Sequence, residues 1–218
     1  MMSTENDRLR ADWLALLERH RAIAVIRTGR VELALAMAQA AAAGGVALIE
    51  IAWNSSQPTE MIGVIQQALP HCVVGVGTVL SGADLKGAIA ANAQFCFTPH
   101  TDCELIYQAQ AHRLPISVGA MTPTEIIAAW RAGATSVKVF PISALGNGAY
   151  IRSLLGPLGP IPLVPTGGVT VDSAPELIAA GAIAVGLSTA IFPPADVDRG
   201  NWAAVTARSR HLLSQLTR

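Results

Sequence analysis

The sequence predicts an α/β fold, a (β/α)8 or TIM barrel preceded by an extra N-terminal helix. Eight short apolar runs alternate with segments of helical periodicity along the 218 residues. The runs are continuously apolar, which is typical of parallel strands covered on both faces. No linker or low-complexity stretch divides the chain. We therefore expect one domain over residues 1–218.

The expected elements follow one another without long gaps. The expected strands are Ala22–Ile26, Ala47–Ile51, Cys72–Val76, Gln94–Phe97, Pro115–Val118, Ser136–Phe140, Ile161–Pro165 and Ile183–Gly186. The expected helices between them are Val31–Ala43, Pro58–Ala68, Leu85–Ala91, Glu104–His112, Pro123–Ala132, Ala144–Leu155 and Ser173–Ala180. An amphipathic helix over Ser3–Arg21 comes first (residues 1–21), the barrel core spans residues 22–193, and a closing helix over Asp198–Leu216 fills residues 198–217.

Several helices carry clear start and stop signals. Thr122-Pro123-Thr124-Glu125 has the composition of a capping box, with Pro at the first helical position. The segment Thr101-Asp102-Cys103-Glu104 also has the composition of a capping box. Four helices are expected to end at residues that favour a left-handed conformation, namely Gly45, Asn92, Gly133 and Gly181.

These four helix ends are followed by strands in equivalent positions. The residues five places later are Glu50, Phe97, Lys138 and Gly186. In our strand count they lie on strands two, four, six and eight. Alternate strands of such a barrel contribute side chains to the same interior layer. We therefore expect Glu50 and Lys138 to point inward at one height, near the carboxyl-terminal mouth.

Composition excludes several classes of protein. Hydrophobic residues make up 51% of the chain and charged residues 14%, so a disordered chain is excluded. The formal net charge is zero and aromatic residues are 5%, which argues against a nucleic-acid partner. The most apolar stretch, residues 33–52, is interrupted by polar residues and glycines, so we expect no membrane association. The polar, charged N-terminus does not have the composition of a signal peptide, which favours a cytoplasmic location.

Neither cysteines nor histidines indicate a metal site. Cys72, Cys96 and Cys103 are odd in number and lack metal-ligand spacing, so we interpret them as reduced thiols rather than a disulfide. The histidines show no HxH or HExxH spacing. Only His100 is expected near the mouth, where it is more typical of a loop residue than of a catalyst.

Lys138 is the first candidate catalytic residue. Only Lys86 and Lys138 are lysines among the fifteen basic residues, and Lys138 lies within an apolar strand. Burial disfavours the charged ammonium form, and an uncharged amine can form a Schiff base with a carbonyl substrate. The alternative is a lysine whose head reaches solvent at the end of the strand.

Glu50 is the second candidate, because it ends the apolar run Val46–Ile49. A carboxyl group in such surroundings should have a raised pKa and suit proton transfer. The alternative is a structural ion pair with Lys138 or Arg27. A buried Glu and Lys at one height suffice for imine chemistry, in which the lysine captures a carbonyl and the carboxyl group moves protons.

Other candidates follow strands and would line the same mouth. Loops after strands seven and eight often bind phosphate in these barrels, and here they carry Thr166-Gly167-Gly168 and Gly186-Leu187-Ser188. Arg27 directly follows the first strand, and its guanidinium can bind a carboxylate or phosphate through two hydrogen bonds. The alternative is a surface salt bridge. Thr78 closes the third strand, where a simple turn hydroxyl is the alternative.

Taken together, the motifs resemble the class I aldolases that cleave 2-keto-3-deoxy-6-phosphogluconate (KDPG), a family shared with 4-hydroxy-2-oxoglutarate (KHG) aldolases. The resemblance runs from about Ala22 to Pro193. The matching stretches are Ala24–Arg27, Ala43–Glu50, Gly75–Leu80, Thr98-Pro99, Val137–Pro141 and Pro165–Val169.

The resemblance implies a role for each matching residue. Lys138 would be the Schiff-base lysine and Glu50 the general acid/base. Residues at the pyruvate end would be Arg27, Thr78 and Pro99, and those at the phosphate end Thr166, Gly167, Gly168 and Ser188. We also expect Asn54, Phe140 and Gly186 to contact substrate. The implied protein is a homotrimer that binds a phosphorylated 2-keto acid and pyruvate, without a metal or organic cofactor.

Two departures leave the substrate open. The gluconate enzymes carry Leu-Arg-Thr where this chain has Trp53-Asn54-Ser55, which resembles the branch acting on the galactonate epimer (KDPGal). The loop Pro165-Thr166-Gly167-Gly168, in contrast, resembles the gluconate branch. His100 stands where a Gly usually follows the Pro. Cleavage of KHG and decarboxylation of oxaloacetate are further alternatives. Outside this family, the alternatives are a barrel that binds a phosphorylated ligand without covalent chemistry, such as an isomerase or synthase, and a non-enzymatic scaffold.

Overall fold

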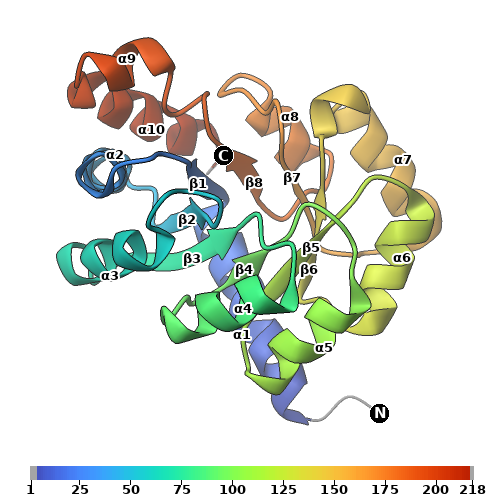
Figure 1. Cartoon of the computed structure of the whole chain (residues 1–218). Helices are drawn as coiled ribbons and strands as arrows, with labels where there is room; N and C mark the ends of the chain where they lie inside the picture. Colours follow the sequence, from blue (N-terminus) through green and yellow to red (C-terminus); the bar gives the residue numbers. More distant parts are fainter. Residues whose placement is uncertain (1–3, 217–218) are drawn as a thin grey trace.

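The computed structural model describes residues 4–216 and has the predicted barrel (Figure 1). Eight parallel strands follow the order β7-β6-β5-β4-β3-β2-β1-β8. They are β1 (Ala22–Ile26), β2 (Leu48–Ala52), β3 (Val73–Gly77), β4 (Cys96–Phe97), β5 (Ile116–Ala120), β6 (Ser136–Val139), β7 (Leu163–Pro165) and β8 (Val185–Leu187). A bridge between Thr166 and Gly186 joins the two ends of the sheet. The (β/α)8 prediction is confirmed.

Helices pack around the strands, and all but the first belong to the outer layer. They are α1 (Thr4–His20), α2 (Val31–Ala43), α3 (Pro58–Ala68), α4 (Gly82–Ala90), α5 (Cys103–Ala111), α6 (Pro123–Ala132), η1 (Ile142–Ala144), α7 (Gly148–Leu158), α8 (Ala174–Ala179), α9 (Pro194–Asp198) and α10 (Trp202–Leu216). Each main helix buries one apolar stripe. In α2 the stripe comprises Ala34, Met37, Ala38 and Ala41, at helical spacing. In the described part of the chain, no helix has the length and apolarity needed to cross a bilayer.

Two helices and one cap differ from the prediction, and the remaining element boundaries agree with the sequence to within three residues. The predicted helix Ala144–Leu155 is divided into η1 and α7. The predicted closing helix Asp198–Leu216 was also wrong, because α9 and α10 are separated at Gly200, which has a φ of +64°. The capping box predicted at Thr101–Glu104 was wrong, because the N-cap is Asp102, whose side chain accepts from two backbone amides, while the Thr101 hydroxyl donates to the Gly119 carbonyl. The predicted ends at Ser3 and residue 217 lie outside the described residues.

The predicted capping signals are otherwise confirmed. Thr122 and Glu125 form a reciprocal capping box at the start of α6. The four residues predicted to end helices in a left-handed conformation all have a positive φ, namely Gly45 (+100°), Asn92 (+59°), Gly133 (+98°) and Gly181 (+106°). Their common spacing to the following strand therefore reflects a common local structure.

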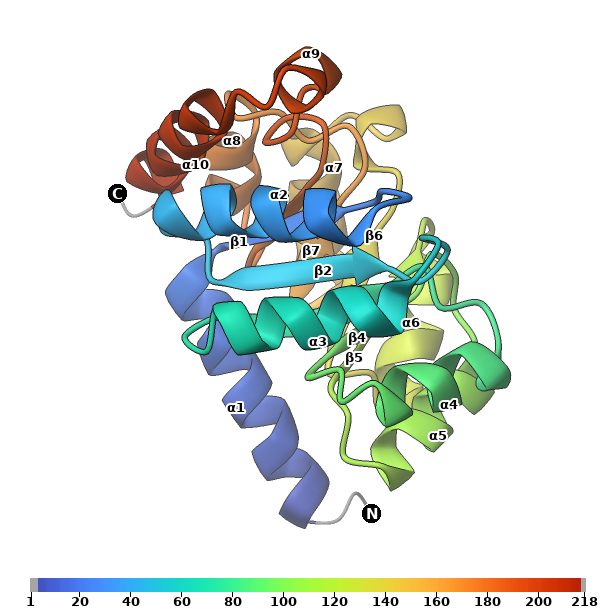
Figure 2. The same ribbon diagram turned by 60° about the vertical axis from the view of Figure 1, so that its left-hand side comes forward.

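The N-terminal helix α1 contributes to the barrel interior. It lies apart from the ring of outer helices and reaches the barrel at the start of β1 (Figure 2). Its Trp13 side chain is 2% exposed and packs against Phe95 and Phe97, with ring centres 5.1 and 6.2 Å away. The Trp13 indole N–H donates to the Ser136 hydroxyl at 3.0 Å. Aromatic side chains therefore fill the barrel beneath the level of Lys138.

Candidate active site

A cavity of about 580 Å³ lies where the carboxyl-terminal ends of the strands meet. Every predicted site residue except Asn54 lines it. The full set of lining residues is Val25, Arg27, Glu50, Thr78, Pro99, Lys138, Phe140, Thr166, Gly167, Gly168, Val169, Gly186, Ser188 and Thr189. These residues come from seven of the eight strands or the loops that follow them, as expected for a site at this end of a barrel.

Lys138 is held inside the barrel by β6. It pairs with Gly119 on β5 and Val164 on β7, and its side chain is among the buried polar groups, at 6% exposure. Its Nζ atom lies 5.0 Å from the centre of the Phe140 ring and 5.8 Å from that of Phe97. The lysine head therefore lies between aromatic rings at the cavity wall, which does not fit the alternative of a head reaching bulk solvent.

Glu50 is held by β2, next to β1 and β3, and is 2% exposed. Burial raises the pKa of its carboxyl group above the ordinary value, while the charges of Lys138 and Arg27 act in the opposite direction. The ion pairs found among residues 4–216 are Arg8–Asp12, Arg113–Glu5, Arg152–Glu176 and Arg208–Asp196. None involves Glu50, so the alternative of a structural ion pair is not what this geometry shows. A carboxyl group in this setting can keep and exchange a proton at higher pH than an exposed one.

Arg27 and Thr78 lie together at the mouth. The Arg27 guanidinium donates from Nη2 to the Thr78 hydroxyl at 3.1 Å. Thr78 has a φ of +59°, which a β-branched residue rarely adopts. Such strained backbone concentrates at functional sites, where the surrounding structure enforces it. The strain fits the predicted binding role of Thr78 better than that of an ordinary turn hydroxyl.

The glycine loop after β7 bends tightly where it lines the cavity. Gly167 and Gly168 have φ values of +86° and +78°, which glycine adopts without strain. A Cβ atom at Gly167 would lie 2.9 Å from the Phe140 ring, and one at Gly168 would lie 2.3 Å from the Ser143 hydroxyl. Both glycines are therefore required by conformation and by space, as expected for a loop whose backbone approaches a ligand.

Two residues singled out in the sequence are not part of this cavity. Asn54 is exposed in the loop after β2 and is not among the lining residues. His100 is also exposed, and its carbonyl accepts from the Thr98 hydroxyl at 2.5 Å. Its loop passes so close to β5 that a Cβ atom at Gly119 would lie 2.6 Å from the His100 nitrogen.

Three lining residues, Val25, Val169 and Thr189, were not predicted from the sequence. Val25 could have been found from strand alternation, because it lies two residues before Arg27 and shares its face. Val169 and Thr189 adjoin predicted residues, but nothing in their local sequence separates cavity lining from ordinary loop packing.

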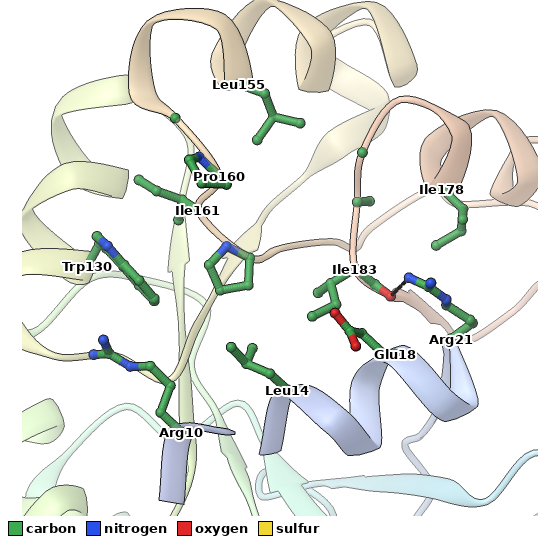
Figure 3. Close-up of a pocket in the computed structure, with 14 residues that line it drawn as sticks. Arg10, Leu14, Glu18, Arg21, Trp130, Leu155, Pro160, Ile161, Ile178 and Ile183 are labelled. Atoms are coloured by element: carbon green, nitrogen blue, oxygen red, sulfur yellow. Dashed lines mark hydrogen bonds between the residues drawn. The ribbon is translucent and has the colours of Figure 1, made fainter. Parts of the chain in front are cut away.

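A larger cavity, of about 760 Å³, lies beside α1 and contains none of the predicted site residues. Figure 3 shows its apolar wall, with Leu14, Trp130 and Ile183 facing inward. The Arg10 guanidinium stacks 4.2 Å from the centre of the Trp130 ring, and Arg21 donates to the Ile183 carbonyl at 2.9 Å. No cluster of three or more potential metal ligands occurs in residues 4–216, here or elsewhere.

Comparisons with known proteins agree with this geometry. Residues 14–208 match the family described as "Aldolase: KDPG and KHG aldolase". A "2-dehydro-3-deoxy-phosphogluconate aldolase" of Pseudomonas aeruginosa is 33% identical over 195 residues, which is 89% of each chain.

Two solved structures share the fold. A "Native KDPGal structure" has a TM-score of 0.78 and 30% identity, covering 89% of this chain and 96% of that one. The KDPG aldolase from Legionella pneumophila, solved with pyruvate captured as a covalent carbinolamine intermediate, has a TM-score of 0.84 and 24% identity, covering 90% and 96%. The resemblance inferred from the sequence is confirmed: this chain belongs to the KDPG and KHG aldolase family and is an aldolase, a carbon–carbon lyase.

Proposed function

We propose that Lys138 forms a Schiff base and Glu50 transfers protons in the reversible cleavage of a 2-keto-3-deoxy-6-phospho sugar acid to pyruvate and glyceraldehyde 3-phosphate. One observation carries this assignment: a lysine and a glutamate, both almost fully buried, face the same cavity at the barrel mouth. A buried amine and a carboxyl group with a raised pKa are the two groups that imine chemistry requires.

The steps balance with these two groups and water. The Lys138 amine attacks the C2 ketone to give a carbinolamine, which loses water to form an imine. The imine, protonated on nitrogen, accepts the electron pair of the C3–C4 bond as that bond breaks, while Glu50, directly or through a water, takes the C4 hydroxyl proton. The aldehyde leaves and an enamine remains on Lys138. Protonation at C3 and hydrolysis by water release pyruvate and restore the amine.

We assign the two ends of such a substrate to two groups of residues that line the cavity. Arg27, Thr78 and Pro99 form the group that we assign to the carboxylate of pyruvate, because a guanidinium can bind a carboxylate through two hydrogen bonds. Thr166, Gly167, Gly168 and Ser188 form the group that we assign to the phosphate. Backbone amides of a glycine loop and neighbouring hydroxyls are the donors that phosphate sites commonly use.

The galactonate epimer is the second candidate substrate. It is favoured by Asn54-Ser55, which replaces the Arg-Thr typical of the gluconate enzymes, whereas the loop Pro165–Gly168 resembles the gluconate branch. A panel of both epimeric phosphates, KHG and oxaloacetate, compared by kcat/KM, distinguishes these substrates. Because Asn54 is exposed outside the cavity lining, Asn54→Ala should change that ranking only if the loop closes on substrate.

We also propose that the chain is a cytoplasmic homotrimer. A solved chain 29% identical to this one belongs to a protein cage "designed by fusing symmetric oligomeric domains", which supports self-association in this family. The three free thiols, Cys72, Cys96 and Cys103, fit a reducing compartment. Light scattering coupled to gel filtration tests the trimer, and a monomeric or dimeric mass would contradict it.

Borohydride trapping with pyruvate tests the main proposal. Reduction should fix a pyruvate adduct on the wild-type chain, and peptide mass spectrometry should locate it at Lys138. Lys138→Ala and Lys138→Arg should lose both adduct and cleavage, while Lys86→Arg, which changes the other lysine, should keep both. An adduct that persists in the Lys138 variants would overturn the proposal. So would phosphate-dependent protection of the glycine loop with no adduct at all, which the non-covalent alternative expects.

A further inference from the structure

We propose that Gly77 is a positioning residue for Glu50, because the space where its side chain would stand is occupied by the Glu50 carboxyl group. Gly77 ends β3 and is buried. In the sheet, Glu50 pairs with Gly75, and Ala52 pairs with Gly77. Gly75 and Gly77 therefore share the inward face with Glu50. The Glu50 side chain leans towards the mouth and comes to lie over Gly77.

The distances leave no room for a side chain at this position unless the end of the Glu50 side chain moves aside. A Cβ atom on Gly77 would lie 1.7 Å from Oε1 of Glu50, 2.4 Å from Cδ and 2.9 Å from Cγ. Real Cβ atoms do not approach other heavy atoms so closely. Moreover, Gly77 is not among the described glycines with a positive φ, so its backbone would accept alanine. Glycine at position 77 therefore avoids a steric clash with the Glu50 side chain, and the backbone conformation does not require it.

The packing fixes where the carboxyl group can go. The backbone of β3 supports it from one side, and the cavity lies on the other, because Glu50 is a lining residue while Gly77 is not. A methyl group at Gly77 would push the carboxyl group into the cavity, away from the buried place that raises its pKa. The catalytic consequence of this displacement rests on the proposed role of Glu50, whereas the packing relationship does not.

The neighbouring Gly75 provides a matched control. It lies on the same strand and the same face, two residues earlier. A Cβ atom there would lie 2.4 Å from the Phe95 ring and 2.5 Å from the Phe95 carbonyl oxygen, and Glu50 is not among its nearest neighbours. Alanine at Gly75 therefore overpacks the aromatic interior, while alanine at Gly77 overpacks the carboxyl group.

A double-mutant cycle tests the proposal in the full-length protein. Gly77→Ala should lower kcat about 100-fold or more, the range of a displaced proton-transfer group, while borohydride still traps a pyruvate adduct. It should also lower Tm. In a Glu50→Ala background, where the carboxyl group is absent, Gly77→Ala should cause no further loss of kcat and no further fall in Tm. Gly75→Ala should lower Tm equally in both backgrounds.

Each outcome of the cycle decides the question. A Gly77→Ala variant that is insoluble alone but folds together with Glu50→Ala supports the proposal, because removing the carboxyl group restores the space. Equal falls in Tm in both backgrounds, failure of the double variant to fold, or full activity of Gly77→Ala when Glu50→Ala is impaired would overturn it. If Glu50→Ala itself keeps full turnover, the proposed catalytic role of Glu50 fails. The Tm values of the four proteins still test whether Gly77 and Glu50 compete for the same space.

Discussion

The Glu50 carboxyl group and the Lys138 amine face one cavity but are not joined by an ion pair within residues 4–216. Each group can therefore be altered without leaving the other as half of a broken pair. Burial rather than a partner also dominates the pKa of Glu50. Variants at this position should thus report on proton transfer rather than on a lost salt bridge.

Glu50→Gln should lower kcat by about 10²- to 10⁴-fold, the usual contribution of a positioned acid or base. The amide keeps the shape of the side chain but neither accepts nor gives up a proton at this step. A pyruvate adduct on Lys138 should still form, more slowly, and be trapped by borohydride. Steady-state cleavage rates and intact mass measure the two effects, and unchanged turnover would remove Glu50 from the mechanism.

The same substitution should stabilise the fold in a pH-dependent way. Burial raises the pKa of Glu50 above its ordinary value of 4.5, so the folded state binds this proton more tightly than the unfolded state does. The wild type therefore loses stability as the pH rises above 4.5, until the folded carboxyl group has ionised. Urea unfolding between about pH 4 and pH 8 should show the advantage of Glu50→Gln growing with pH. An advantage that shrinks with rising pH would contradict the assigned direction.

Trp13→Phe should lower the free energy of unfolding by about 1–2 kcal/mol, because it removes the hydrogen bond to Ser136 inside the barrel. The ring that packs on Phe95 and Phe97 is largely retained. Ser136→Ala should cost a similar amount in the wild type and much less in the Trp13→Phe background. Denaturant unfolding of the four proteins measures this coupling, and strictly additive losses would show that the bond contributes nothing.

Thr122→Ala should lower the free energy of unfolding by about 1 kcal/mol, a common cost of losing an N-cap. The Thr122 hydroxyl caps α6 by accepting from the Glu125 amide, at 3.3 Å. The expected fall in Tm is about 2–4 °C for a domain of this size. Thr122→Ser keeps the hydroxyl and should retain most of the stability. Calorimetry measures both, and equal falls would indicate that the cap is not the cause.

Arg27→Ala should raise the KM for pyruvate in the aldol direction by about tenfold or more, since a hydrogen bond to a charged group contributes roughly 1.5–3 kcal/mol. Arg27→Lys should restore this only partly, because an ammonium cannot make the paired hydrogen bonds of a guanidinium. Initial rates at varied pyruvate concentration provide the test. An unchanged KM would place the carboxylate elsewhere in the cavity.

Local sequence signals were enough to predict which residues meet at the mouth. Gly45 and Gly133 end helices in the same conformation, so the strands after them start in the same way and carry Glu50 and Lys138 to one cavity. The spacing predicted this juxtaposition because it repeats one local structure around the barrel.

Contacts between distant segments were not predictable in this way. Trp13 and Ser136 are 123 positions apart, and nothing near either residue indicates that they meet. The packing at Gly77 was not predictable either, because the side chain that fills the space beside it is Glu50, on the neighbouring strand β2. Asn54 lies exposed outside the cavity lining, so its expected contact with substrate stays a prediction.

The Thr166–Gly186 bridge, which joins the first and last strands of the sheet order, lies within the cavity lining. A bound anion that contacts Thr166 and Ser188 would link the loops that follow β7 and β8 and so stabilise the junction between these two strands. Occupancy of the phosphate end should therefore slow opening of the barrel as a whole. Amide hydrogen exchange in β7 and β8 would then report saturation by inorganic phosphate even when no carbon–carbon bond is made or broken.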